Sequence, residues 1–465
     1  MAGIEFSLEP KQTQLIDTAY RHIRTKLPVP ESLPLLEALR AKEARSMRGQ
    51  PPVIWREAEG FAVRDGYGNQ WLDWSSGVLI TNAGHNHPRI KRALSEYVNS
   101  ASPLATYCFP NEPRERLVSK LHEITPNELD RVFLLSTGSE ATEVGIKLAR
   151  TYGIGKDPSK RYFVTFADGF HGRTYGAQLA GGGQGGGEWI DENPFFVQTP
   201  FPGSIETQDR GFGAFLDTLK RHKISPDHVA GVMSETFQGR EAKLMPTEYA
   251  QALRRWCDAH DAALIFDEVQ AGFGRTGKMF AFEHYGIVPD IVCCGKGISS
   301  SLPISAVIGS AKYVDQYGPG AMTSTHTGSP IPCVAALASI EAILEEGMIE
   351  NAARVGAYLM DQVQSIAAPF ADRIEVGGQG LVIGMLFFNN RNDLNPDADA
   401  AFEFCERCYH GGNLFFAPVG KGMGAVKFCP PLCITREAVE DGLYGPGGIK
   451  EALEAVMGAR TAGVE

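Results

Sequence analysis

A junction between an apolar run and a helical pattern is the first segment whose residues could do chemistry. The run VFLLS at 132–136 leads directly into Thr137-Gly138-Ser139-Glu140, and the residues that follow have helical spacing. Backbone N–H groups at the start of a helix are free, and the helix dipole adds positive potential there. The segment therefore predicts a phosphate site at Gly138 and Ser139, with Ser139 as an ordinary helix N-cap as the open alternative.

An acidic pair ends a second apolar run. ALIF at 263–266 leads into Asp267-Glu268. A buried aspartate needs a cationic partner. A protonated pyridine nitrogen would be such a partner, and a carboxylate that holds this proton makes the ring an electron sink. The alternative for Asp267 is a structural ion pair or a helix cap.

A lysine between two glycines follows a third apolar run. IVCC at 291–294 is followed by Gly295-Lys296-Gly297. Partial desolvation lowers the pKa of a lysine amine and frees it to form a Schiff base. Alone, this pattern is typical of an exposed turn. Together with the two preceding features, it predicts a phosphate-containing cofactor held on Lys296.

Two nucleotide-dependent classes share part of this pattern. Asp-Glu after an apolar strand is also typical of a Walker B segment, but no G-x-x-x-x-G-K-[ST] occurs in the chain. Gly181, Gly183 and Gly186 match G-x-G-x-x-G only inside a glycine-rich run that does not open a helix. A nucleotide hydrolase and a dinucleotide dehydrogenase are therefore disfavoured.

Six apolar runs must position these residues. They do not alternate with polar residues, which favours strands covered on both faces and hence a mostly parallel α/β sheet. Ligands of such a sheet bind at the carboxyl ends of its strands. The predicted strands are 132–136, 162–166, 229–235, 263–268, 291–294 and 304–309.

The flanking segments predict a second, smaller α/β lobe. Residues 1–50 have the pattern of helices with proline breaks, one reaching to Thr25, and FAVRDGYGNQWLDW from Phe61 predicts a β-hairpin. After Pro330 we expect a long helix over 335–367, two strands, a helix over 398–410 and a last helix after Thr435. The predicted domains are 1–90 as an N-terminal helical segment and hairpin belonging to the small domain, 91–345 as the large cofactor domain, and 346–465 as the C-terminal small domain.

Composition restricts the partners. The chain has 465 residues, of which 43% are hydrophobic and 21% charged, and a net charge of −11. This charge gives no general attraction for nucleic acid or an anionic membrane, so a phosphate-bearing small molecule must be captured locally. Because neither a signal peptide nor an apolar span is evident, we expect a cytoplasmic protein.

Four of the nine cysteines have a spacing similar to that of a zinc clip. They are Cys405, Cys408, Cys429 and Cys433. The second pair lies in VKFCPPLC, an apolar strand running into a proline turn, where small buried thiols are the simpler interpretation. We therefore expect no metal.

The order of motifs resembles that of the class III, or ω-, aminotransferases of the ornithine and 4-aminobutyrate type. The resemblance runs from about Pro52 to Gly442. Its motifs are GYGNQWLDWSSG, GHNHP, STGSEATE, GFHGRT, LIFDEVQAGFGRTG, PDIVCCGKGISSSLPISAVIG, THTGSP and VKFCPPL. Motifs in this order and spacing are much more specific than any one of them.

The resemblance implies fold type I, the aspartate aminotransferase fold, with pyridoxal 5'-phosphate as cofactor and a homodimer with shared active sites. Lys296 would be the Schiff-base residue and would also move the proton between Cα and C4' of the cofactor. The further cofactor contacts that it implies are Gly138 and Ser139 at the phosphate, Phe170 and Val269 on the two ring faces, Asp267 at the pyridine nitrogen, Gln270 at the 3-hydroxyl, and Thr325 at the phosphate of the neighbouring subunit.

The substrate residues depart from the family pattern. Arg173, after GFHG, matches an arginine that binds a distal carboxylate in the family, although it could instead form a structural ion pair. Where the family has an arginine that grips an α-carboxylate, this chain has Lys427, a point charge in place of a planar fork. The segment that begins at Glu235 is expected to contribute Glu235 itself to substrate binding, and it has Arg240 at a position often held by glutamate. Our hypothesis is that Arg240, alone or with Lys427, binds the carboxylate, or that the substrate differs from 4-aminobutyrate and 2-oxoglutarate.

The resemblance implies transamination from an amino acid or ω-amine donor to a keto acid. Racemases, aminomutases and a decarboxylase of the same family use similar machinery, and the altered substrate residues keep that alternative open. A cofactor-binding protein without activity is disfavoured because Lys296, Asp267 and Gln270 are all present.

Overall fold

The computed structural model describes residues 5–182, 189–191, 193–205 and 207–462. It divides into two compact units, one formed by Met1–His87 with Asn351–Glu465 and the other by Pro88–Glu350. We call them the terminal unit and the central unit. Most of the glycine-rich run, from residue 183 onward, lies outside the described residues.

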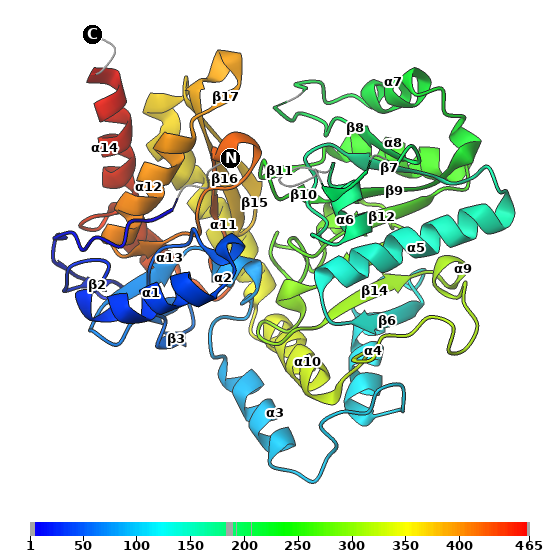
Figure 1. The fold of residues 1–465 in the computed structure, drawn as a ribbon, viewed down its shortest axis with the longest axis horizontal. Coiled ribbons are helices and arrows are strands. Elements are labelled where there is room, and N and C mark those ends of the chain that lie inside the picture. Colours follow the sequence, from blue (N-terminus) through cyan, green and yellow to red (C-terminus); the bar gives the residue numbers. More distant parts are fainter. Residues whose placement is uncertain (1–4, 183–188, 192, 206, 463–465) are drawn as a thin grey trace. The chain divides into compact units, whose positions relative to one another are not determined.

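A seven-stranded sheet forms the middle of the central unit (Figure 1). Its order is β6-β14-β13-β12-β9-β7-β8, and every neighbouring pair is parallel except the two pairs made by β14. The strands are β6 (Arg131–Leu135), β7 (Tyr162–Phe166), β8 (Phe196–Thr199), β9 (Val229–Glu235), β12 (Ala263–Asp267), β13 (Ile291–Cys294) and β14 (Ser305–Gly309). All six predicted strands are confirmed. The edge strand β8 was not predicted because its apolar run is only three residues long.

Helix α5 (Gly138–Lys156) lies along this sheet because its inner face is made of small residues (Figure 1). Ala141, Gly145, Ala149 and Gly153 recur every four residues and are buried. A Cβ at Gly145 would lie 3.1 Å from Cys293 Sγ, and one at Gly153 would lie 2.7 Å from Ala230 Cβ. The helix axis therefore sits close to the strands.

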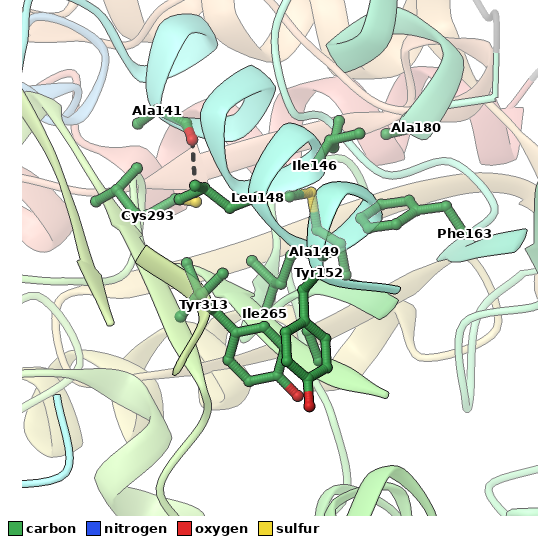
Figure 2. Close-up of a cluster of buried hydrophobic side chains, with 14 of the residues drawn as sticks. Ala141, Ile146, Leu148, Ala149, Tyr152, Phe163, Ala180, Ile265, Cys293 and Tyr313 are labelled. Carbon is green, nitrogen blue, oxygen red and sulfur yellow. Dashed lines mark hydrogen bonds between the residues drawn. The ribbon is translucent and has the colours of Figure 1, made fainter. Parts of the chain in front are cut away.

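Larger side chains complete the core between α5 and the sheet. Ile146, Leu148 and Tyr152 from the helix pack with strand residues such as Phe163 and Ile265, all of them buried (Figure 2). The Cys293 thiol donates to the Ala141 carbonyl at 3.4 Å, drawn as the dashed line in Figure 2. This packing fixes the N-terminus of α5 relative to β13.

The remaining elements of the central unit surround this sheet, and α10 packs against α3 and α4. The α-helices are α3 (Pro88–Val98), α4 (Glu112–Glu123), α6 (Tyr175–Ala180), α7 (Gly213–Arg221), α8 (Thr247–Ala259), α9 (Ala311–Val314) and α10 (Pro330–Glu345). The short elements are η4 (Pro226–His228), β10 (Phe237–Gln238), β11 (Lys243–Leu244), η5 (Ala281–Tyr285) and η6 (Lys296–Ile298).

The terminal unit contains two sheets. In the first, β1 (Ile16–Asp17), β2 (His22–Ile23), β5 (Gln70–Asp73), β4 (Ala62–Arg64) and β3 (Glu57–Glu59) are neighbours in that order, and β18 (Asn413–Leu414) joins β5. The register Ala62↔Leu72 and Arg64↔Gln70 confirms the predicted hairpin. The second sheet holds β15 (Ile374–Gln379), β16 (Val382–Asn390), β17 (Asn395–Pro396) and β19 (Ala425–Phe428).

The helical elements of the terminal unit come from both ends of the chain. From the N-terminal part come η1 (Pro30–Ser32), α1 (Leu33–Lys42), η2 (Arg45–Met47) and the left-handed turn α2 (Ser76–Leu79). From the C-terminal part come α11 (Met348–Ala367, which begins in the central unit), η7 (Ala368–Phe370), η8 (Arg391–Asp393), α12 (Ala398–His410), η9 (Lys421–Met423), α13 (Arg436–Tyr444) and α14 (Ile449–Ala462).

Three predicted helices are corrected. The expected helix reaching Thr25 is wrong, because β1 and β2 pair with each other and β2 pairs with β5. The expected helix over 335–367 is two helices, α10 and α11, separated at Gly347, whose φ of +66° ends the first. The last helix is likewise divided into α13 and α14 by Gly445-Pro446-Gly447-Gly448.

Membrane-spanning helices and metal-binding clusters are both absent from the described ranges. Among these residues, no helix has both the length and the apolar character needed to cross a bilayer. In the same part of the chain, no three His, Cys, Asp or Glu side chains form a group that could hold a metal ion, and the nine cysteines are free thiols.

Candidate active site

The carboxyl edge of the central sheet gathers most of the predicted site residues. β6, β7, β9, β12 and β13 run in the same direction, so their carboxyl ends meet at this edge. In the register, Asp267 at the end of β12 lies beside Glu235 of β9 and Cys293 of β13. Lys296 follows three residues after Cys293.

The first turn of α5 is fixed by its own cap. Thr137 is the N-cap, and its hydroxyl accepts from the Glu140 N–H at 3.3 Å. The Glu140 carboxylate accepts from the N–H groups of Ser136 and Thr137 at 2.9 and 2.8 Å. The alternative of Ser139 as N-cap is therefore wrong. Gly138 and Ser139 lie in the first turn, where N–H groups lack intrahelical partners and can bind an anion.

Asp267 is buried and shares a hydrogen bond with a histidine. Only 4% of Asp267 is exposed, and its Oδ2 lies 2.8 Å from His171 Nδ1. Its Oδ1 accepts from the Val269 N–H at 3.0 Å. Asp267 therefore does pair with a side chain of the protein, the buried His171. A structural pair of this kind was the alternative role for Asp267.

His171 is a site residue that our sequence reasoning did not single out, although it lies in the quoted GFHGRT motif. Burial alone would lower the pKa of His171, but the hydrogen bond and charge of Asp267, with the charge of Glu235, outweigh burial and raise that pKa. His171 Nε2 is buried, and no hydrogen bond reaches it from the described residues. The sequence signal available was a histidine directly after Phe170.

Val269 is held between two glycines. A Cβ at Gly138 would lie 2.8 Å from Val269 Cγ1, and a Cβ at Gly295 would lie 3.3 Å from the same atom. The two glycines therefore let the start of α5, the end of β13 and the segment after β12 approach one another. Any larger residue at Gly138 would push Val269 away from this position.

Glu235 connects three segments of the edge. It is 4% exposed, and its carboxylate accepts from the N–H groups of Phe170 and Gly239, each at 3.0 Å. It also accepts from Gln270 Nε2 at 3.1 Å. Burial raises the pKa of Glu235. Glu235, which we predicted to bind the substrate, therefore hydrogen-bonds to Phe170 and Gln270 and holds them in place.

Lys296 begins η6 in a strained conformation. Its φ is +44°, a left-handed value that costs a residue with a side chain about 1–2 kcal/mol. Such strain persists only where the surroundings impose it, and it is common at functional sites. Lys296 is half-buried, while Gly295 and Gly297 on either side are buried.

Phe170 and Arg173 lie on the loop after β7. Phe170 is 38% exposed, so much of its ring is open to a ligand. The guanidinium carbon of Arg173 lies 5.5 Å from the centroid of that ring. Thr325, before α10, is exposed.

The other two predicted substrate residues are not at the strand ends of the central sheet. Arg240 is in the turn between β10 and β11, with its Nη1 3.8 Å from Asp168 Oδ1. Lys427 is on β19 of the terminal unit, buried, with its Nζ 5.7 Å from the centroid of the Phe416 ring. The structure therefore brings all the predicted residues except Lys427 into one unit.

The edge as a whole suits an anionic, aromatic aldehyde. It combines a helix N-terminus for a phosphate, a buried carboxylate for a cationic ring nitrogen, an apolar side chain for a ring face and a lysine amine for an aldehyde. These donors fit pyridoxal phosphate.

Comparisons with known proteins agree with this geometry. A family model described as Aminotransferase class-III matches residues 44–446. The acetylornithine aminotransferase of Methanopyrus kandleri is 36% identical over 338 residues, 72% of this chain and 80% of the relative. The 4-aminobutyrate aminotransferase of Mycobacterium leprae is 30% identical over 438 residues, 91% of this chain and 96% of the relative.

A solved structure shows the same fold. It is the ornithine aminotransferase of Toxoplasma gondii, described with partial occupancy of PLP at its active site. Its TM-score is 0.79 at 26% identity, and the match covers 94% of this chain and 97% of that one.

Proposed function

Because the chain belongs to the class III aminotransferases and is a PLP-dependent transaminase, we propose that Lys296 carries its cofactor and that its substrates bear carboxylates. The observation that carries the proposal is the convergence of Asp267, Val269 and Lys296 with the N-terminus of α5 at one sheet edge. Fold type I agrees with this topology.

The residues that would hold the cofactor come from different elements. Gly138 and Ser139 would bind its phosphate, Asp267 its pyridine nitrogen, and Gln270 its 3-hydroxyl. Phe170 and Val269 would contact the two ring faces, and the amine of Lys296 would bind the aldehyde carbon. When bound, the group supplies an electron sink for the bond that is broken at the substrate Cα.

Two residues act on reacting atoms. Once the substrate amine has replaced it at the aldehyde carbon, the Lys296 amine would be free to accept the proton from the substrate Cα as a general base and to deliver a proton at C4' as a general acid. Asp267 would hold the proton on the pyridine nitrogen of the bound cofactor. His171, whose pKa is raised, would place a positive charge beside Asp267. This charge keeps Asp267 ionised, and an ionised Asp267 is needed to pair with the protonated pyridine nitrogen.

Glu235 acts as a positioning residue in this proposal. Its hydrogen bonds to Phe170, Gln270 and Gly239 hold Phe170 at the ring face and Gln270 at the 3-hydroxyl. This role replaces the direct substrate contact that we expected from the sequence, because Glu235 is buried under those residues.

Carboxylate recognition rests on three cations. Arg173 and Arg240 are in the central unit and Lys427 is in the terminal unit. Acetylornithine, succinylornithine and 4-aminobutyrate, which the relatives are named for, all carry a carboxylate. An arginine fork binds a carboxylate through two parallel hydrogen bonds, which makes Arg173 and Arg240 the stronger candidates.

A homodimer is part of the proposal. The segment after α3 exposes large apolar side chains, with Leu104 58% and Phe109 71% exposed. Burying such side chains against a second copy is favourable. Thr325 would then reach the phosphate of the partner's cofactor. Light scattering of the purified protein should give twice the mass of one chain, and a monomeric mass would contradict this part.

The test of function uses amino donors with and without a carboxylate. Purified protein, loaded with cofactor, is mixed with a donor and a 2-oxo acid, and the new amino acid is measured by chromatography. We expect turnover with carboxylate-bearing donors and none when the 2-oxo acid is omitted. Turnover of the donor without any 2-oxo acid would instead support a racemase, mutase or decarboxylase.

A further inference from the structure

A cavity on the outer side of α5 has no role in the function proposed above. Helix α6 packs against both α5 and β8 (Figure 1), and residues of these three elements line a space of about 690 Å³ within the central unit. A volume of this size suits a small molecule. We call this cavity, which is also lined by Asn193, the α5 hollow.

The α5 hollow lies on the side of α5 that faces away from the sheet. Lys147 and Thr151 line it, whereas Ala149 between them is buried in the core. Two residues turn an α-helix by about 200°, so the lining side chains project away from the strands. Lys147 and Arg150 are also about 14 and 18 Å along the helix from Gly138. The hollow is therefore separate from the proposed phosphate site.

The walls of the α5 hollow are largely apolar. Ile154 of α5 is 39% exposed and Tyr175 of α6 is 50% exposed. Leu179 and Phe196, from α6 and β8, are half-buried and complete the wall. Burying such side chains against an apolar ligand is favourable, and a concave apolar surface is where small molecules usually bind.

Arg150 places a positive charge at this apolar wall. Its guanidinium carbon lies 5.6 Å from the centroid of the Phe196 ring, and its Nε is buried without a hydrogen-bond partner among the described residues. In the same part of the chain, no carboxylate pairs with it. Burial, and then the charge of Arg161, lower the pKa of Arg150. A bound anion would therefore compensate a charge that the protein leaves without one.

Lys147 adds a second cation to the α5 hollow. Its Nζ lies 4.6 Å from the centroid of the Tyr317 ring. Among the described residues that line the hollow, Glu143 has the only carboxylate, and its Oε1 accepts from the Thr174 hydroxyl and the Gly176 N–H at 2.6 and 2.7 Å. This carboxylate is thus used to hold the start of α6. The two cations outnumber it, so the hollow attracts anions.

We propose that the α5 hollow binds a small molecule with an apolar body and one carboxylate. The body would lie against Ile154, Leu179 and Phe196. The carboxylate would accept hydrogen bonds from the Arg150 guanidinium, whose planar fork matches it, and would be attracted by the Lys147 ammonium. The site is additional to the active site and does not depend on the roles assigned there.

The experiment measures the binding of octanoate and of octan-1-ol to the cofactor-loaded enzyme by calorimetry. The two probes have chains of the same length, but only octanoate carries a charge. Octanoate should bind at least about 10-fold more tightly than octan-1-ol, because a hydrogen bond to a charged group contributes that much. Equal affinities, or no binding of octanoate, would overturn the proposal.

Variants of Arg150 locate the bound octanoate. Arg150→Gln should weaken octanoate binding at least about 10-fold and leave octan-1-ol binding nearly unchanged, whereas Arg150→Lys should retain part of the octanoate affinity. Lys156→Gln is the matched control, since Lys156 is a cation over a tyrosine ring on the same helix but outside the hollow, and it should change neither affinity. An unchanged octanoate affinity in Arg150→Gln would show that octanoate binds elsewhere and would overturn the site.

A substitution at an exposed position provides a test that does not alter Arg150. Ile154→Glu adds a negative charge at the wall of the hollow, at a residue that the fold does not bury. Repulsion should weaken octanoate binding about two- to fivefold, and Ile154→Gln should restore most of that part of the loss. Equal octanoate affinities of the glutamate and glutamine variants would contradict a carboxylate bound in the α5 hollow.

Discussion

Three acidic or imidazole side chains under the carboxyl edge are buried with raised pKa values. Two of them are His171 and Glu235. The third is Glu268, which is fully buried. Its carboxylate accepts hydrogen bonds from the N–H groups of Ala281 and Phe282, each at 2.9 Å. Burial raises the pKa of Glu268 to about 7, although the hydrogen bonds from Ala281 and Phe282 partly oppose this rise. Glu268 therefore anchors the start of η5 to the strand that carries Asp267.

The titration of Glu268 predicts a pH dependence of stability. Its ordinary pKa is 4.5 and its pKa in the folded protein is about 7. A raised folded-state pKa means that the folded protein binds the proton more tightly, so the stabilisation is complete below pH 4.5 and is lost as pH rises through about 7. The loss in the free energy of unfolding is about 3 kcal/mol.

Urea denaturation at pH 5 and pH 7.5 tests this dependence. The unaltered protein should be less stable at the higher pH, and Glu268→Gln should remove much of the difference even if it lowers stability at both. His171 and Glu235 shift stability in the same direction, so some dependence should remain. Glu248→Gln, at an exposed position, should leave the difference unchanged. An unchanged pH difference in Glu268→Gln would contradict this assignment.

Residues at strand ends were the predictable part of the candidate site. Asp267 and Lys296 each follow a continuous apolar run, so position alone indicated the carboxyl edge. His171 and Asp168 were not singled out because their partners, Asp267 and Arg240, are distant in the sequence and their pairing depends on tertiary contacts. The supporting role of Glu235 also became visible only with its three bonds.

Helix α5 is the element that joins the core to the phosphate site. Its small residues let it approach the sheet, and its capping box fixes the first turn at Gly138. Because α5 is one continuous helix over Gly138–Lys156, a displacement along it can be transmitted to its N-terminus. Packing at the sheet is thus connected to anion binding.

Two glycines near the end of α5 should respond oppositely to alanine. A Cβ at Gly153 would lie 2.6 Å from the Lys160 carbonyl and 2.7 Å from Ala230 Cβ, whereas a Cβ at Gly155 would meet nothing within 4 Å. We expect Gly153→Ala to destabilise the protein by about 1–3 kcal/mol through overpacking. Gly155→Ala should stabilise it by about 0.5–1 kcal/mol through helix propensity.

Urea denaturation of the two variants under one condition checks the difference in sign. Equal effects of the two substitutions would show that the close approach at Gly153 is absent. The binding of cofactor should also weaken in Gly153→Ala if the shift reaches Gly138, and Gly155→Ala serves as the control for that measurement.

At the level of elements, the sequence predicted the sheet better than the chain ends. Continuous apolar runs located six of the seven central strands, and Asp65-Gly66 with Gly68-Asn69 located the hairpin of β4 and β5. Residues 16–23 form two short strands that pair with each other and, through β2, with β5, a partner far along the chain. Local sequence cannot indicate such pairing.

In the whole molecule, a buried arginine is among the contacts that hold the N-terminal segment to the C-terminal part of the same unit. Arg21 is fully buried, and its Nε and Nη2 donate to Asp441 Oδ2 and the Asp441 carbonyl at 2.8 and 2.7 Å. Its Nη1 donates to the Gly411 carbonyl at 2.6 Å. The terminal unit is therefore closed by a contact between residues 420 positions apart.

Loss of this contact should destabilise the terminal unit. Arg21→Ala would leave Asp441, whose side chain is only 15% exposed, without its cation, at a cost of about 3–5 kcal/mol. Arg24→Ala is the control, because Arg24 and Asp17 form a pair that is 57% and 73% exposed and is worth about 0–1 kcal/mol. Limited proteolysis should cleave the N-terminal segment of Arg21→Ala first. Equal resistance of the two variants would contradict this role.

The measurement that tests the central claim most directly is reduction of the cofactor-loaded protein with borohydride, followed by peptide mapping. If Lys296 carries the cofactor, the reduced cofactor should be found on the peptide that contains Lys296, and Lys296→Ala should show neither the label nor transamination. A label on a different lysine, or an active Lys296→Ala variant, would contradict the account.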